Sequence, residues 1–171
     1  MNKTDNNFEQ FLSSINKCYS KDCQKELPKL EDFPLGLFNS EQVINQEKLF
    51  DFIEETNNQY LKSVSFRILA IIKIQDARET SKELDIKNVW GLVSNSIQII
   101  PKECTISSIG SQGFLSIPLF KYEEEKINFD FIRLHIWDKS LDQYIDNEKC
   151  DKFSIHTHSF FAESWPICGK I

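Results

Sequence analysis

The sequence predicts an α+β fold, in which a mostly helical N-terminal region, residues 1–88, is followed by an antiparallel β domain, residues 89–171. Two observations predict this order. In the first half, apolar residues recur with the three- and four-residue spacing of an amphipathic helix. From Val89 the apolar runs become short, and glycine or proline separates them, which is typical of strands joined by turns.

The first half is predicted to contain two helices with a loop between them. Residues Phe8–Tyr19 carry an apolar stripe at helical spacing. Residues Leu27–Asn39 contain two prolines and a glycine, which indicates a loop. Asn39 or Ser40 can then cap a second helix that runs to about Ser63.

The next apolar run, Val64–Ile74, is compatible with a continued helix or with a buried strand. It is interrupted by polar residues and is too short to span a bilayer, so no membrane segment is predicted. Residues Asp76–Lys87 are predicted to form a charged helix or a linker. No apolar stretch follows the polar N-terminus, so no secretory signal is predicted.

The second half begins with short strands at Ser96–Pro101 and Thr105–Ile109, followed by a turn at Gly110 and Gly113. Residues Phe114–Tyr122 are predicted to form an edge strand or the start of a strand, because they include a proline.

The clearest strand is predicted over Ile127–Asp138. Its even positions form an aliphatic face: Ile132, Leu134 and Ile136. Its odd positions form an aromatic face with two polar members: Phe129, Phe131, Arg133, His135 and Trp137. A strand that is apolar on both faces is expected in a sandwich or a closed barrel.

The net charge and the cysteine content indicate which binding partners and which cellular compartment to expect. The net charge is −6 and the pI is about 5.1, and no basic stripe is present, so nucleic acid is not expected as a partner. The five cysteines are odd in number and irregularly spaced. This spacing predicts reduced thiols in a cytoplasmic protein.

Two of the three histidines, His156 and His158, lie one residue apart near the C-terminus. On a strand their side chains share a face, and a nearby carboxylate would complete a set of two histidines and one carboxylate. Such a set suits iron(II), with zinc, manganese or nickel as alternatives. Glu163 is the candidate carboxylate, although it can join the histidines only if the chain bends between Ser159 and Ala162.

The segment His156-x-His158-x4-Glu163-x5-Gly169 resembles the first conserved motif of the cupins, G-x5-H-x-H-x3-4-E-x6-G. It departs from the motif at the leading glycine, which is Cys150, and in the last interval, which is one residue short. The resemblance covers about the last quarter of the chain. It implies a jelly-roll β-barrel with His156, His158 and Glu163 as metal ligands.

The second cupin motif, which carries a further histidine, is absent. The resemblance therefore implies a barrel that is incomplete at the C-terminus. We expect either that this chain is a fragment of a longer protein or that a partner chain, as in a homodimer, completes the barrel.

Three further residues are candidates for binding a small-molecule substrate. Arg133 could hold a carboxylate, or it could simply pair with Asp130 or Glu125. His135 could line the same pocket as a proton donor or ligand, or be packed and hydrogen-bonded. Trp165 could form an aromatic platform or belong to the core.

The function predicted from these residues is that of a metal-binding, cupin-like protein, with an iron(II)-dependent dioxygenase or another oxidoreductase as its catalytic form. Two alternatives remain open. The chain could be a non-catalytic, cupin-like ligand sensor, or it could be an interaction module whose N-terminal helices dock a partner.

Overall fold

The computed structural model describes residues 3–38, 44–110, 113–124, 128–146 and 163–167. In these ranges the chain forms four α-helices and one antiparallel sheet with the strand order β1-β2-β3. The α+β class is therefore confirmed. The sheet is open over the part of the chain that the structure describes, and a closed barrel stays a prediction.

Helix α1, Lys3–Asn16, forms where the apolar stripe predicts it. Its residues Phe8, Leu12 and Ile15 are buried in the hydrophobic core. They are separated by four and three residues, so they lie on one face of the helix. The predicted loop after this helix is also confirmed, with only a short 3-10 turn at Leu30–Asp32.

The single helix predicted to run to Ser63 is wrong, because the structure has α2 at Gln46–Glu55 and a separate α3 at Gln59–Thr80. Asn58 caps α3, and its side chain accepts hydrogen bonds from two backbone N–H groups of the first turn. The run Val64–Ile74 is helical within α3. Along the described residues, every helix is too short or too polar to cross a membrane.

Residues Ile86–Gln98 form helix α4. The prediction of a strand that begins at Ser96 is therefore wrong. Asp85 caps the helix by accepting a hydrogen bond from the backbone N–H of Asn88. The buried residues have helical spacing: Val89, Leu92, Val93 and Ser96. The boundary predicted between residues 88 and 89 lies inside this helix.

The sheet consists of β1 at Ser108–Ile109, β2 at Phe114–Glu124 and β3 at Asn128–Trp137. Strand β2 is the middle strand, so the prediction of an edge strand is wrong where β1 pairs with it. Pro118 is tolerated because β1 pairs only with Leu115 and Ser116, and because the register between β2 and β3 shifts directly after the proline.

Strand β3 has the two faces that its alternation predicts. Ile132 and Leu134 are buried in the core. Three aromatic side chains of the other face are exposed, with Phe129 at 40%, Phe131 at 37% and Trp137 at 65%. The sheet therefore covers the helices with one face, while its second face stays open to solvent in the described structure.

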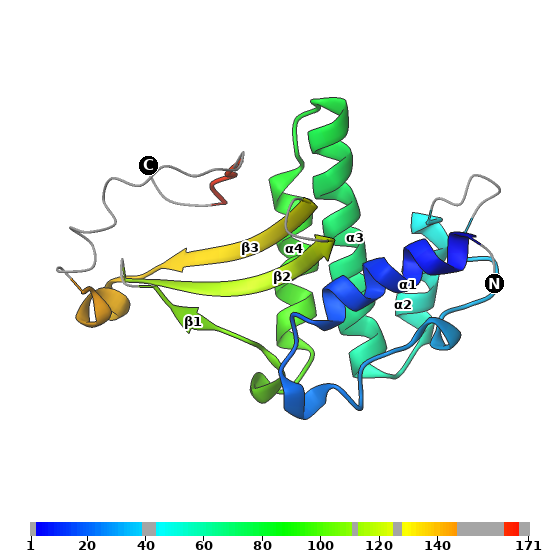
Figure 1. Ribbon diagram of the computed structural model, residues 1–171, viewed down its shortest axis with the longest axis horizontal. Coiled ribbons are helices and arrows are strands. Elements are labelled where there is room, and N and C mark those ends of the chain that lie inside the picture. The colour runs from blue at the N-terminus through cyan, green and yellow to red at the C-terminus, as the bar shows by residue number, and fades with distance from the viewer. Residues whose placement is uncertain (1–2, 39–43, 111–112, 125–127, 147–162, 168–171) are drawn as a thin grey trace.

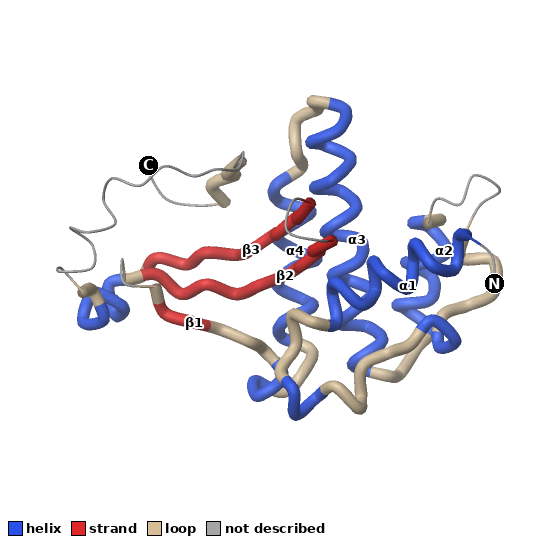
Figure 2. Tube along the Cα trace, in the orientation of Figure 1, coloured by secondary structure: helices blue, strands red, loops and turns tan. Residues whose placement is uncertain are grey.

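The hydrophobic core joins the helices to the sheet. In Figure 1, α3 and α4 stand side by side, α1 crosses α3, and the β2–β3 hairpin projects away from the helices. Figure 2 shows the same division into a helical body and a sheet arm. The buried cluster contains residues of α1, α2, α3, α4, β2 and β3. The helical region therefore packs against the β region within one core.

Cys23 and Cys104 form a disulfide bond, so the prediction of reduced thiols is wrong for this pair. The two cysteines are 81 residues apart, and both are buried. Disulfides persist mainly in oxidising compartments. Localisation in the cytoplasm therefore stays a prediction, and this bond weighs against it. Cys18 is buried as a free thiol.

Reduction of this disulfide should destabilise the protein. For a loop closed over 81 residues, the chain-entropy model gives about 4–5 kcal/mol of stabilisation. The midpoint of urea unfolding should therefore fall clearly when a reductant is added. In the double variant Cys23→Ser/Cys104→Ser, the midpoint should already be low, and the reductant should not change it. Equal midpoints with and without reductant in the wild type would contradict the bond.

Candidate functional site

The predicted metal ligands His156 and His158 lie outside the described residues. Glu163 is described and exposed. Over the described ranges, no group of three or more His, Cys, Asp or Glu side chains could hold a metal ion. Because two of the three predicted ligands lie outside these ranges, this finding does not test the set, and the metal site stays a prediction.

Glu163 lies within electrostatic reach of Arg78, near the end of α3. The Arg78 guanidinium donates two hydrogen bonds to Asp130 of β3, at 3.0 Å to Oδ1 and 2.9 Å to Oδ2. The pKa of Arg78 is raised, chiefly by the hydrogen bond to Asp130 and then by the charges of Asp130 and Glu163. The Arg78–Asp130 ion pair links the start of β3 to α3. Arg78 is also a cationic neighbour of Glu163.

Sequence reasoning missed this ion pair. It offered Asp130 as a partner for Arg133, whereas Asp130 pairs with Arg78 across 52 positions of the chain. The alternation in β3 could have indicated this ion pair, because Asp130 lies at an even position, on the same face as the buried aliphatic residues. A carboxylate on the core-facing side of a strand needs a cation from a neighbouring element.

Arg133 and His135 lie on the open face of β3, as their odd positions predict. Both are exposed. The Arg133 guanidinium carbon lies 5.8 Å from the centroid of the Phe131 ring. Within the described ranges no ion pair engages the Arg133 guanidinium, and its planar fork lies beside an aromatic ring, a geometry suited to a carboxylate or a flat ligand.

The imidazole of His135 belongs to a cluster of three rings, in which the centroids of Phe114 and Trp137 lie 5.4 Å from each other. The imidazole centroid is 4.6 Å from that of Phe114 and 5.7 Å from that of Trp137. Desolvation by these neighbours lowers the pKa of His135 below its ordinary value of 6.5, and the positive charge of Arg133 lowers it further. The ring is therefore mostly neutral near pH 7, so that it can accept or donate a hydrogen bond.

Trp165 is half-buried and packs against the hydrophobic core. This favours the core role among the two that the sequence allowed. Asp130 and His135 lie five residues apart on opposite faces of β3, which is roughly 16 Å of strand. Among the described candidates, only Arg133 and His135 form a joint surface.

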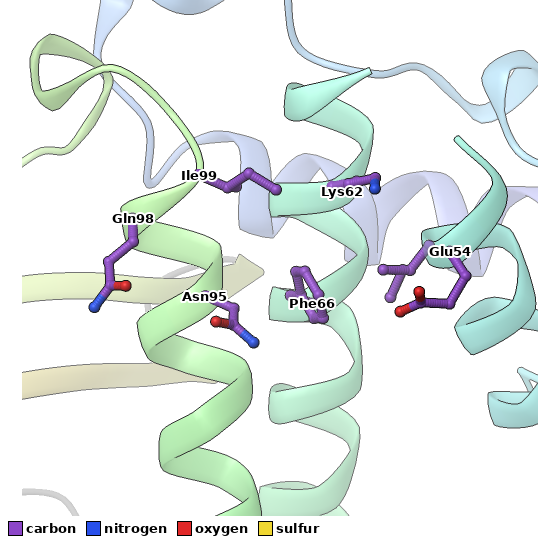
Figure 3. Close-up of a pocket in the computed structure, with 7 residues that line it drawn as sticks. Glu54, Lys62, Phe66, Asn95, Gln98 and Ile99 are labelled. Atoms are coloured by element: carbon purple, nitrogen blue, oxygen red, sulfur yellow. The ribbon is translucent and has the colours of Figure 1, made fainter. Parts of the chain in front are cut away.

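Two hollows of the described structure lie on the helical body and beside Asp130. The larger, about 300 Å³, is an open groove between α2, α3 and α4, and in Figure 3 Phe66 lies at its centre with Lys62 and Glu54 toward one side. Its lining residues are Ile53, Glu54, Lys62, Phe66, Asn95, Gln98 and Ile99. The smaller, about 230 Å³, lies beside Asp130 and is lined by Gln10, Phe11, Gln75, Phe120, Tyr122 and Asp130. No predicted site residue lines either hollow.

Removing the charge of Arg133 should raise the pKa of His135. Arg133 disfavours the protonated imidazole, so Arg133→Gln should move the titration midpoint upward, toward 6.5. An NMR titration of the histidine ring protons measures this shift, and His135→Asn assigns the resonance. Lys121→Gln is the matched control on the same sheet and should leave the midpoint unchanged. An equal midpoint in the wild type and in Arg133→Gln would contradict the proximity of the two side chains.

Comparison of the chain with protein-family models, with curated proteins and with solved structures gives no match. The resemblance to the cupins therefore rests on the spacing of His156, His158, Glu163 and Gly169 alone.

Proposed function

We propose that this chain is a metal-binding, cupin-like protein that acts on a small molecule. Its metal ligands are His156, His158 and Glu163, and Arg133 and His135 contact the substrate. The observation that carries this proposal is the open face of β3, which presents Arg133 and His135 between exposed aromatic rings. The histidine pair follows this strand in the sequence, and the resemblance to the cupins implies that both belong to one jelly roll.

The exposed aromatic face supports a double-sheet architecture. Phe129, Phe131 and Trp137 are partly exposed to solvent on a sheet whose other face is packed on helices. Soluble proteins rarely leave such a surface uncovered. In a jelly roll a second sheet covers it, and the space between the two sheets becomes the ligand pocket.

The side chains on this face define what the pocket would recognise. Arg133 carries a permanent positive charge and can bind a substrate carboxylate through two parallel hydrogen bonds. The neutral imidazole of His135, packed against Phe114 and Trp137, can exchange a proton with a bound substrate. A bound iron(II) ion would supply open coordination positions for oxygen and substrate.

A second candidate function is a non-catalytic ligand-binding module that uses the same sheet face without a metal. The position of Glu163 favours this alternative, because its carboxylate has the Arg78 guanidinium as an electrostatic neighbour. A cation at this position competes with a metal ion for the carboxylate.

Metal binding by the full chain tests the proposal. The purified protein is incubated separately with Fe(II), Zn(II), Mn(II) and Ni(II), and the bound metal is then measured by elemental analysis. His156→Ala and His158→Ala should each weaken binding by about tenfold or more, since even outer-sphere partners of a metal contribute that much. Glu123→Gln, which removes a surface carboxylate paired with Lys121, is the control and should bind like the wild type.

Two outcomes separate the candidate functions. Metal bound by the wild type and lost in both histidine variants supports the metal site, and oxygen consumption in the presence of Fe(II) then identifies the oxygenase form. Equal metal binding in the wild type and in His156→Ala would refute the metal site. In that case, metabolite-induced thermal stabilisation that Arg133→Gln abolishes would support the ligand-binding module.

A further inference from the structure

The groove between α2, α3 and α4 uses none of the residues assigned to the metal or to the substrate. Its walls follow from the spacing of residues along the helices. Lys62 and Phe66 are four residues apart on α3, and Asn95 and Gln98 are three residues apart on α4. Residues at these spacings share one face of a helix. Each helix therefore presents a defined set of side chains to the groove.

The middle of the groove is apolar. Phe66 is half-buried and lies at the centre of the groove in Figure 3. Two isoleucines complete the apolar lining, Ile53 with 1% of its surface exposed and Ile99 partly buried against the core. A flat aromatic ring can pack on the Phe66 ring at such a position. The volume of about 300 Å³ is at the lower limit for ligand pockets, which favours a small molecule.

One side of the groove carries two opposite charges. Glu54, near the end of α2, and Lys62, in the first turn of α3, lie on the same side of Phe66 (Figure 3). Among the described residues, no ion pair joins these two side chains. A ligand that carries an ammonium and a carboxylate on one carbon atom matches this arrangement, because both of its charges face the same side.

The other side of the groove carries two carboxamides. Asn95 and Gln98 lie across Phe66 from the charged pair (Figure 3). A carboxamide donates and accepts hydrogen bonds, so this side suits a neutral polar group such as a phenolic hydroxyl. From one side to the other, the groove therefore offers charges, an aromatic ring and amides. Tyrosine has the same order of groups, with its two charges at one end and its hydroxyl at the other.

We propose that this groove binds a free aromatic amino acid of the tyrosine type. The ammonium of the ligand faces Glu54 and its carboxylate faces Lys62. Its ring packs on Phe66, and its hydroxyl forms hydrogen bonds with Asn95 or Gln98. A tyrosine at the end of a peptide lacks one of the two charges, so the groove selects the free amino acid. The proposal is independent of the metal site, since the two sites share no residue.

Titration of the full chain with L-tyrosine, followed in two-dimensional NMR spectra of the backbone amides, tests the site. We expect saturable shifts for the residues that line the groove. Tyramine lacks the carboxylate and para-hydroxyphenylpropionate lacks the ammonium, so each should bind about fivefold more weakly than tyrosine, the upper range for an exposed ion pair. L-Phenylalanine lacks the hydroxyl and should bind about threefold more weakly.

Two variants assign the charges of the ligand to the two side chains. Lys62→Gln should weaken the binding of tyrosine about fivefold and leave that of tyramine unchanged, because tyramine has no carboxylate to lose. Glu54→Gln should weaken the binding of tyrosine and leave that of para-hydroxyphenylpropionate unchanged. The controls Lys73→Gln on α3 and Glu55→Gln on α2 do not line the groove and should bind like the wild type.

Three outcomes would overturn the proposal. The first is the absence of saturable shifts up to the solubility limit of tyrosine. The second is a set of shifts confined to residues outside the groove. The third is equal affinity of the wild type for tyrosine, tyramine and para-hydroxyphenylpropionate, because the charged side would then not be recognised. These outcomes need only the wild type, so they decide the question even if a variant does not fold.

Discussion

The fold depends on the burial of α3 on nearly all sides. Residues Ser63–Ser65 and Arg67–Ile71 are buried, so this helix has no continuous solvent face in its middle. Helices α1, α2 and α4 and strand β2 pack around it. The two arginines of this helix both contact other parts of the chain. Arg67 contacts Tyr19 in the core, and Arg78 holds the start of β3.

The elements that the sequence predicts well are those with one buried face. Helix α1 carries apolar residues at helical spacing, and strand β3 alternates between aliphatic and aromatic positions, so their type follows from the pattern. The middle of α3 is buried on nearly all sides, and a run of this kind has no period that separates helix from strand. The end of α4 is rich in isoleucine, which suggests a strand, although packing against α3 keeps it helical. The caps Asn58 and Asp85 mark the true helix starts.

The candidate site could be predicted only where it depends on local order. The parity of β3 places Arg133 and His135 on one face, and the structure agrees. Contacts between distant segments have no local signature. The pairing of Asp130 with Arg78 and the bond between Cys23 and Cys104 join residues that are 52 and 81 positions apart. Five cysteines allow many pairings, and only the folded chain selects one of them.

The disulfide and the buried arginine belong to the same part of the molecule. Tyr19 forms a β-bridge with Thr105, and the backbone N–H of Ser20 donates to the carbonyl of Cys104. The disulfide therefore fixes the segment that holds the Tyr19 ring over Arg67. Since the cation–π contact is the only described partner of the guanidinium, loosening this segment would expose the charge to water. Water solvates a free guanidinium well, which favours the opened state. The covalent bond counteracts this tendency by keeping the two segments together.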